Sequence, residues 1–140
     1  MHLGKLRLWR FLIIHRSSNQ VTLFNSQKGL CPLTFAVQND IPSAVAYLMS
    51  VPSVDVNVLM PDGRFPLLIA SETDDRIQCI SLLANAADID LNKESTEGMT
   101  SLMVAVAENR LLALQALLAF GADVNYRSRL LGMFTVGATV

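Results

Sequence analysis

The chain has 140 residues, of which 51% are hydrophobic and 16% charged. This composition excludes an intrinsically disordered protein and allows one domain with a hydrophobic core. The formal net charge is −1, but no acidic residue precedes Asp40 and all 12 acidic residues lie from that position onward. The two cysteines, Cys31 and Cys79, are too few for a disulfide framework and lie in apolar runs, so we expect buried, reduced thiols.

Residues 1–28 form a basic segment with an apolar stretch at residues 8–14. This stretch is interrupted by Arg10 and is too short to span a bilayer as a helix. The acid-free start followed by Ser17 and Ser18 resembles a mitochondrial presequence in composition, but we favour a structural use of the segment. Its five basic residues are widely spread, so we expect no nucleic-acid partner and keep membrane contact as a minor alternative.

Three similar windows follow at residues 29–36, 63–70 and 98–105, each beginning with Gly and ending with Ala. The glycines are 34 and then 35 residues apart, and a Leu lies four residues after each of them. Each unit then closes on an Asp-x-Asn signature, and the insertions between units fall only just before this signature. Stacked supersecondary units tolerate insertions in this way, because each unit contacts only its neighbours. The signatures end at Asn57, Asn92 and Asn125.

Within each unit the pattern predicts a helix, a turn, a second helix and a loop. Pro32 and Pro66 fit the first position of a helix, where a missing N–H costs nothing. In the third unit Thr100 is the expected helix cap, and Gly121 the residue that ends the second helix. The turn sequence Pro61-Asp62-Gly63 separates the first two units. Asn109 and Arg110 mark the break between the two helices of the third unit, where leucines then recur at helical spacing.

The repeating residues resemble the ankyrin repeat, whose pattern residues 98–125 match without a gap. Together the three units at residues 29–125 cover about two thirds of the chain. The resemblance implies an all-α, helix-turn-helix solenoid with inter-repeat β-turn or hairpin loops. It divides the chain into a degenerate capping half-repeat at residues 1–28 and repeats at 29–62, 63–97 and 98–131, followed by a partial unit at 132–140.

Some positions depart from the family pattern. The usual His is replaced by Thr34, Leu68 and Met103, and the usual Thr is replaced by Cys31 and Phe65 in two units. Loss of the capping hydroxyl removes about 1 kcal/mol per unit. Ala86 also replaces a helix-ending Gly, so we expect a marginally stable array.

The chain has few residues suited to catalysis or to metal binding. Its only histidines, His2 and His15, lie in the basic segment, and neither cysteine lies near a His in a nucleophile motif. The sequence Asp88-x-Asp90-x-Asn92 resembles the opening of a calcium loop but lacks the required Gly and Glu at later positions. We therefore expect no enzyme activity, cofactor or metal.

An acidic cluster of Glu72, Asp74 and Asp75 lies between the two predicted helices of the second unit. We interpret it as a solvated turn, with contact to a basic partner as the alternative.

The family resemblance implies that partners bind to the loop tips and to the inner face of each first helix. Arg64 with Leu59, Met60 and Met99 is expected to form a partly apolar patch that carries a forked donor. The positions that the resemblance assigns to partner binding are Leu30, Gln38, Asn39, Arg64, Glu72, Thr73, Met99, Ala107 and Glu108.

These observations favour a cytoplasmic scaffold or adaptor that binds a protein partner through its concave face and loop tips. Two alternatives remain open: a fragment of a longer ankyrin-repeat protein without independent function, and an N-terminally targeted or membrane-associated repeat protein. No transmembrane span is expected. The fold does not identify the partner, since one fold hosts many functions.

Overall fold

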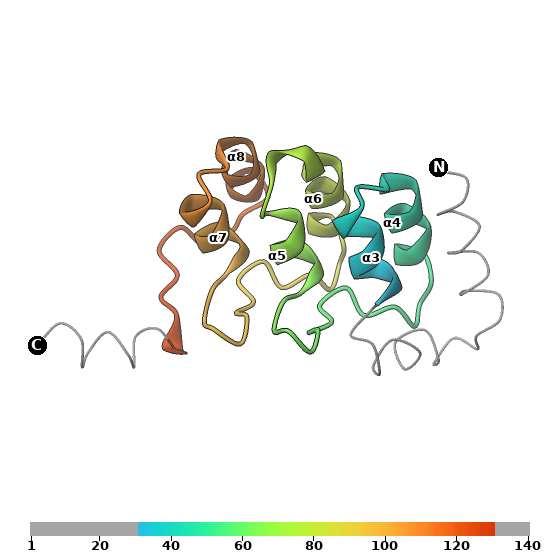
Figure 1. The fold of residues 1–140 in the computed structure, drawn as a ribbon, viewed down its shortest axis with the longest axis horizontal. Coiled ribbons are helices and arrows are strands. Elements are labelled where there is room, and N and C mark those ends of the chain that lie inside the picture. Colours follow the sequence, from blue (N-terminus) through green and yellow to red (C-terminus); the bar gives the residue numbers. More distant parts are fainter. Residues whose placement is uncertain (1–30, 131–140) are drawn as a thin grey trace, which may run out of the picture.

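The computed structural model describes residues 31–130, which contain α-helices, one 3-10 helix and no strand (Figure 1). The all-α class expected from the sequence is confirmed. The predicted capping half-repeat, the partial unit at 132–140 and Leu30 lie outside the described residues. The elements are α3 Pro32–Gln38, α4 Pro42–Met49, α5 Pro66–Ala70, η2 Asp74–Arg76, α6 Ile77–Ala84, α7 Ser101–Ala107 and α8 Leu111–Ala119.

The helices form two parallel rows, as Figure 1 shows. The first helices of the three units, α3, α5 and α7, lie side by side and are called the inner helices below; α4, α6 and α8 are the outer helices. Each inner helix also packs against the outer helix of its own unit. The segments that join the units extend to one side of both rows. This arrangement is the predicted helix-turn-helix solenoid.

The residues at the start of each inner helix explain where the helix begins. Pro32 and Pro66 are the first residues of α3 and α5, as predicted, and each follows a residue with extended backbone. Thr100 caps α7, because its Oγ1 accepts a hydrogen bond from the Met103 N–H at 3.2 Å. Cys31 and Phe65 provide no such side-chain cap, which confirms the expected loss in the first two units.

The core is built from the repeated Leu and Ala of the three windows. Leu33, Leu67 and Leu102 are buried, and the three alanines that end the windows are fully buried between the rows. Because Ala is small, the helices of neighbouring units approach closely at these positions. The thiols of Cys31 and Cys79 are also buried and unpaired, in agreement with the prediction.

The Asp of each Asp-x-Asn signature folds the loop locally. The side-chain oxygen of Asp55 accepts from the N–H of Asn57 at 2.9 Å. Asp90 and Asp123 make the same contact with the Asn two residues later, at 3.1 and 2.9 Å. This is an Asx turn, in which a side chain replaces a backbone acceptor.

The Asn of the signature joins one unit to the next. Asn57 Oδ1 accepts from the Asp90 N–H at 2.9 Å, and its Nδ2 donates to the Asp88 carbonyl at 2.7 Å. Asn92 Oδ1 accepts from the Asp123 N–H at 3.0 Å, one unit further along. The Asp88-x-Asp90-x-Asn92 sequence is therefore part of the repeat loops, as expected.

Candidate functional site

A hollow of about 480 Å³ lies between the second and third units. Its walls come from the inner helices α5 and α7 and from the loop tips at residues 62–64 and 95–99. We call it the concave hollow. Six of the nine residues that the sequence assigned to partner binding line it: Arg64, Glu72, Thr73, Met99, Ala107 and Glu108.

The other predicted residues lie elsewhere. Gln38 is exposed at the end of α3 in the first unit, and Asn39 follows it, with its Nδ2 donating to the Phe35 carbonyl at 2.9 Å. Neither lines the concave hollow. The fold therefore brings together the predicted residues of the second and third units but not those of the first.

Two stacked loop tips form one wall of the hollow. In the first, Met60 N–H donates to the Arg64 carbonyl at 2.8 Å, and in the second, Ser95 N–H donates to the Met99 carbonyl at 2.8 Å. The predicted turn at residues 61–63 ends on Gly63, whose φ is +89°. The two tips are joined by a hydrogen bond from the Thr96 N–H to the Gly63 carbonyl at 3.3 Å. The hairpin loops thus repeat with the helices.

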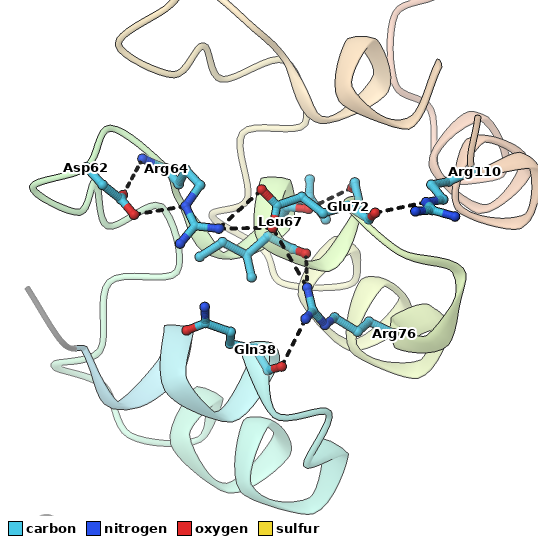
Figure 2. A network of polar contacts seen from close by, with 9 residues as sticks. Gln38, Asp62, Arg64, Leu67, Glu72, Arg76 and Arg110 are labelled. Atoms are coloured by element: carbon cyan, nitrogen blue, oxygen red, sulfur yellow. Dashed lines mark hydrogen bonds and ion pairs between the residues drawn. The ribbon is translucent and has the colours of Figure 1, made fainter. Parts of the chain in front are cut away.

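The guanidinium of Arg64 is occupied within the chain (Figure 2). Its Nε donates to Asp62 at 2.9 Å, and its Nη1 donates to both carboxylate oxygens of Glu72 at 3.0 and 3.2 Å. The forked donor of the predicted patch thus already binds two carboxylates of its own chain. Met60 is buried and belongs to the core, and Leu59 is exposed but does not line the hollow.

These contacts shift the pKa values of Asp62 and Arg64. Partial burial of Asp62 opposes its charged form, but the hydrogen bonds and charge of Arg64 outweigh burial and lower the pKa of this carboxyl. Burial also disfavours the charged form of Arg64, yet Asp62 and Glu72 together raise the pKa of the guanidinium. The Asp62–Arg64 pair is therefore favoured in its charged form, and the bonds of Arg64 to Asp62 and Glu72 hold the wall of the hollow in one geometry.

The acidic cluster is not simply a solvated turn, so that interpretation is wrong for two of its three members. Glu72 binds Arg64, and Asp74 Oδ1 accepts from the Ala113 N–H at 3.1 Å, in the first turn of α8. Asp75 is exposed. A turn of one unit therefore caps the outer helix of the next, which sequence spacing alone did not indicate.

Two arginines that the sequence analysis did not select connect the units (Figure 2). Arg76 Nη2 donates to the Gln38 carbonyl at 3.0 Å, and its Nη1 donates to the Ile69 carbonyl at 2.7 Å. Arg110 Nε donates to the Glu72 carbonyl at 3.0 Å. Each inter-unit contact spans 38 residues, and the arginines are themselves 34 residues apart. The spacing of 34 residues between these two arginines was the sequence signal that could have identified them.

The lining of the concave hollow is acidic. It contains the carboxylates of Asp62, Glu72, Glu97 and Glu108 and the guanidinium groups of Arg64 and Arg110, a formal charge of −2. Glu97 and Glu108 are exposed, and neither forms an ion pair with any residue in 31–130. Met99, Val104 and Leu68 supply apolar wall. The Oγ1 atom of Thr73, also a lining residue, is buried without a hydrogen-bond partner among the described residues.

A second hollow of about 420 Å³ lies against the third unit. Its lining is mostly apolar and includes Leu102, Met103, Leu114 and the exposed side chains of Val106, Leu118 and Val124. Beside it Tyr126 donates a hydrogen bond to Glu94, which also accepts from Ser128 and from the Arg129 N–H. These bonds, first that of Tyr126, lower the pKa of the Glu94 carboxyl. They hold the chain after α8 against Glu94, in the loop that closes the second unit.

The described residues were also compared with the requirements of metal binding and of a membrane span. Within residues 31–130, no group of three or more His, Cys, Asp or Glu side chains is placed to hold a metal ion. None of the helices described is long and apolar enough to cross a membrane. The chemistry on the surface of the concave hollow is that of hydrogen bonding, charge and apolar contact.

Comparison with known proteins identifies the repeat. A family model described as ankyrin repeats, in three copies, matches residues 33–128. A search of curated proteins gave no match.

Proposed function

The chain belongs to the ankyrin repeat family, and we propose that it binds a protein partner in the concave hollow between its second and third units. Ankyrin repeats are generally protein–protein interaction modules and are typically not enzymes. In this proposal the chain is a scaffold or adaptor of the cytoplasm, a reducing compartment that suits the free thiols of Cys31 and Cys79.

One observation carries the proposal. Six residues that the family resemblance assigned to partner binding, from two different units, line a single hollow. Concave sites with an apolar wall and a few placed polar groups are the usual form of a binding site. The walls are helices and tied loop tips, and rigid elements hold contact residues in place before the partner arrives.

Site-specific photo-crosslinking tests where a partner binds. Benzoylphenylalanine is introduced in place of Ala107, which is exposed in the hollow, and in place of Ala46, which is exposed on the outer helix α4. The two positions form a matched pair, because both are exposed alanines in short helices. In cells, we expect a crosslinked protein from position 107 that is missing from position 46.

The circular dichroism spectrum of both variants must match that of the parent chain. Crosslinking at position 46 alone, or the same products from both positions, contradicts binding in the concave hollow.

A further inference from the structure

The third unit repeats two carboxylates of the second unit but not the arginine that joins them. We propose that the partner supplies this cation, as an arginine side chain that binds Glu97 and Glu108 across the surface of α7. This inference deepens the proposed function and depends on it. It rests on the contacts of the equivalent residues one unit earlier and on the charge of the concave hollow.

The second unit shows how the two carboxylates hold a guanidinium (Figure 2). Asp62 lies at the loop tip and Glu72 lies just after the inner helix α5. Arg64 joins them, because its Nε donates to Asp62 at 2.9 Å and its Nη1 donates to Glu72 at 3.0 Å. In this fold, a carboxylate at the loop tip and one at the end of the inner helix are therefore close enough to share one guanidinium.

The third unit has a carboxylate at the same place in its loop tip. Glu97 precedes Gly98 as Asp62 precedes Gly63. The two tips close on equivalent backbone hydrogen bonds, so their side chains start from equivalent positions. Glu97 is exposed and lines the concave hollow, and its carboxylate has no hydrogen bond or ion pair within residues 31–130.

The third unit also has a carboxylate at the end of its inner helix. Glu108 directly follows α7, one residue beyond the position equivalent to Glu72. It too is exposed, lines the concave hollow and has no side-chain partner in the part of the chain that the structure describes. Met99 stands where the second unit has Arg64. The third unit therefore presents both acids with an apolar residue in place of the bridging arginine.

The repeat geometry keeps this surface accessible. In the second unit the side chains of Asp62 and Arg64 are 45% and 30% exposed, although the third unit stacks beside them. A unit stacked on the third would leave Glu97 and Glu108 accessible in the same way. The ten residues that follow Leu130 contain no Lys, Arg or His, so they do not supply the cation.

The charge of the hollow favours a cation. Its lining has a formal charge of −2, and the guanidinium groups within it are already bonded. Arg64 binds two carboxylates, and Arg110 binds the Glu72 carbonyl. Opposite charges attract more strongly at a partly enclosed surface than in bulk water. An acidic or phosphorylated partner segment is disfavoured for the same reason.

The arrangement of the two acids favours arginine over lysine. A guanidinium donates from several N–H groups in one plane, so it can bind two carboxylates together, whereas an ammonium is a compact point charge. Arg64 binds its two carboxylates in this way. Met99 and Val104 line the same hollow and suit the aliphatic part of an arginine side chain.

Peptide binding to the full chain tests the inference. The probes are three pools of fluorescein-labelled nonapeptides with Arg, Lys or Gln fixed at the centre and uncharged residues randomised elsewhere. Binding is measured by fluorescence anisotropy, and we expect affinity to decrease in the order Arg, Lys, Gln. Glu97→Gln and Glu108→Gln should each weaken binding of the Arg pool roughly fivefold, the upper range for a partly exposed ion pair.

A substitution at Met99 tests the equivalence of the two units. Met99→Arg places the chain's own guanidinium beside the two acids, as Arg64 is placed in the second unit. The Arg pool should then bind no better than the Gln pool. Met99→Gln is the matched control, because it introduces an uncharged side chain of similar length and should keep the preference for Arg.

Asp88→Asn is the control for loss of a negative charge, since Asp88 is exposed and does not line the hollow. It should bind the Arg pool within about twofold of the parent chain, because distant surface charges are screened. The inference is overturned if no pool binds, or if the Arg and Gln pools bind the parent chain equally. It is also overturned if Glu97→Gln and Glu108→Gln weaken binding no more than this control, or if Met99→Arg keeps the preference for Arg.

The two proposals fail separately. Crosslinking from position 107 in cells together with equal binding of the three peptide pools removes the arginine site and leaves the protein-binding hollow. Loss of the position 107 crosslink removes both.

Discussion

Gly63 lies at the tip of the loop before α5, where a residue of one unit touches the loop of the next. Its φ of +89° is a conformation that L side chains rarely adopt. A Cβ built at this position would lie 1.8 Å from Thr96 Oγ1 and 2.9 Å from Thr96 Cβ. Gly121 has a φ of +102° but faces open space. The two glycines share one backbone requirement and differ in the space around them.

This difference predicts the outcome of two alanine substitutions. Gly121→Ala should lower the free energy of unfolding by roughly 1–2 kcal/mol, the cost of a left-handed L residue. Gly63→Ala should cost clearly more, because the loop tips must also separate. Urea unfolding of both variants measures the difference, and equal losses would show that contact between the loop tips is unimportant for stability.

At the scale of the element, the outer helix α8 is capped by a side chain of the preceding unit. Arg110 precedes α8, but its side chain does not cap this helix. Asp74 supplies the missing acceptor from the second unit, through its bond to the Ala113 N–H. Asp40 holds the same position in the first unit, and its carboxylate accepts from the thiol of Cys79 at 3.8 Å, early in α6. A cap provided across a unit boundary ties the stability of one helix to the presence of its neighbour.

Asp74→Ala should therefore destabilise the chain by about 1 kcal/mol, the usual value of a helix cap. Asp74→Asn should retain most of the stability, since the amide oxygen can still accept the hydrogen bond. Asp75→Ala is the control, because Asp75 is adjacent and exposed. Chemical denaturation gives the three values, and an equal effect of Asp74→Ala and Asp75→Ala would rule out the cap across units.

At the scale of the whole molecule, stability comes from contacts between neighbouring units. Each helix row packs unit against unit, and the Asn57, Asn92, Arg76 and Arg110 bonds cross the same boundaries. In such an array the free energy is approximately the sum of unit and interface contributions. Cys79 is fully buried in the middle unit, so its thiol reports on the opening of this stack.

Burial, with the nearby charge of Asp40, raises the pKa of the Cys79 thiol to about 12 from an ordinary value of 9.0. Below pH 9 the thiol is protonated in both the folded and unfolded chains. Above that value the unfolded chain alone loses the proton, so stability falls as pH rises from 9 to about 12. We expect a loss of up to about 1.4 kcal/mol per pH unit from this group.

Urea unfolding of the parent chain and of Cys79→Ala at pH 8 and pH 10.5 tests this prediction. The substitution should reduce the difference in stability between the two pH values, although it lowers stability at both. An unchanged difference would mean that the thiol is not shielded in the folded array.

The sequence predicted the repeat and the residues at which the inner helices begin. It also selected the residues of the second and third units that line the hollow. These features depend on local chemistry, because a period of 34 residues, a proline at the first helical position and a threonine cap act within one unit. The prediction was wrong for Met60 as part of a surface patch, because this side chain is buried in the core.

Only the tertiary structure decided how the polar side chains are shared between units. Whether Asp74 is solvated depends on Ala113, 39 residues away in the next unit, and Arg76 binds the Gln38 carbonyl, 38 residues away in the preceding unit. The sequence by itself determined that the units stack, since neither helix of a unit can bury its apolar face alone. Stacking then placed each carboxylate and guanidinium beside a neighbour, because the strength of a charge–charge contact depends on distance in space and not along the chain.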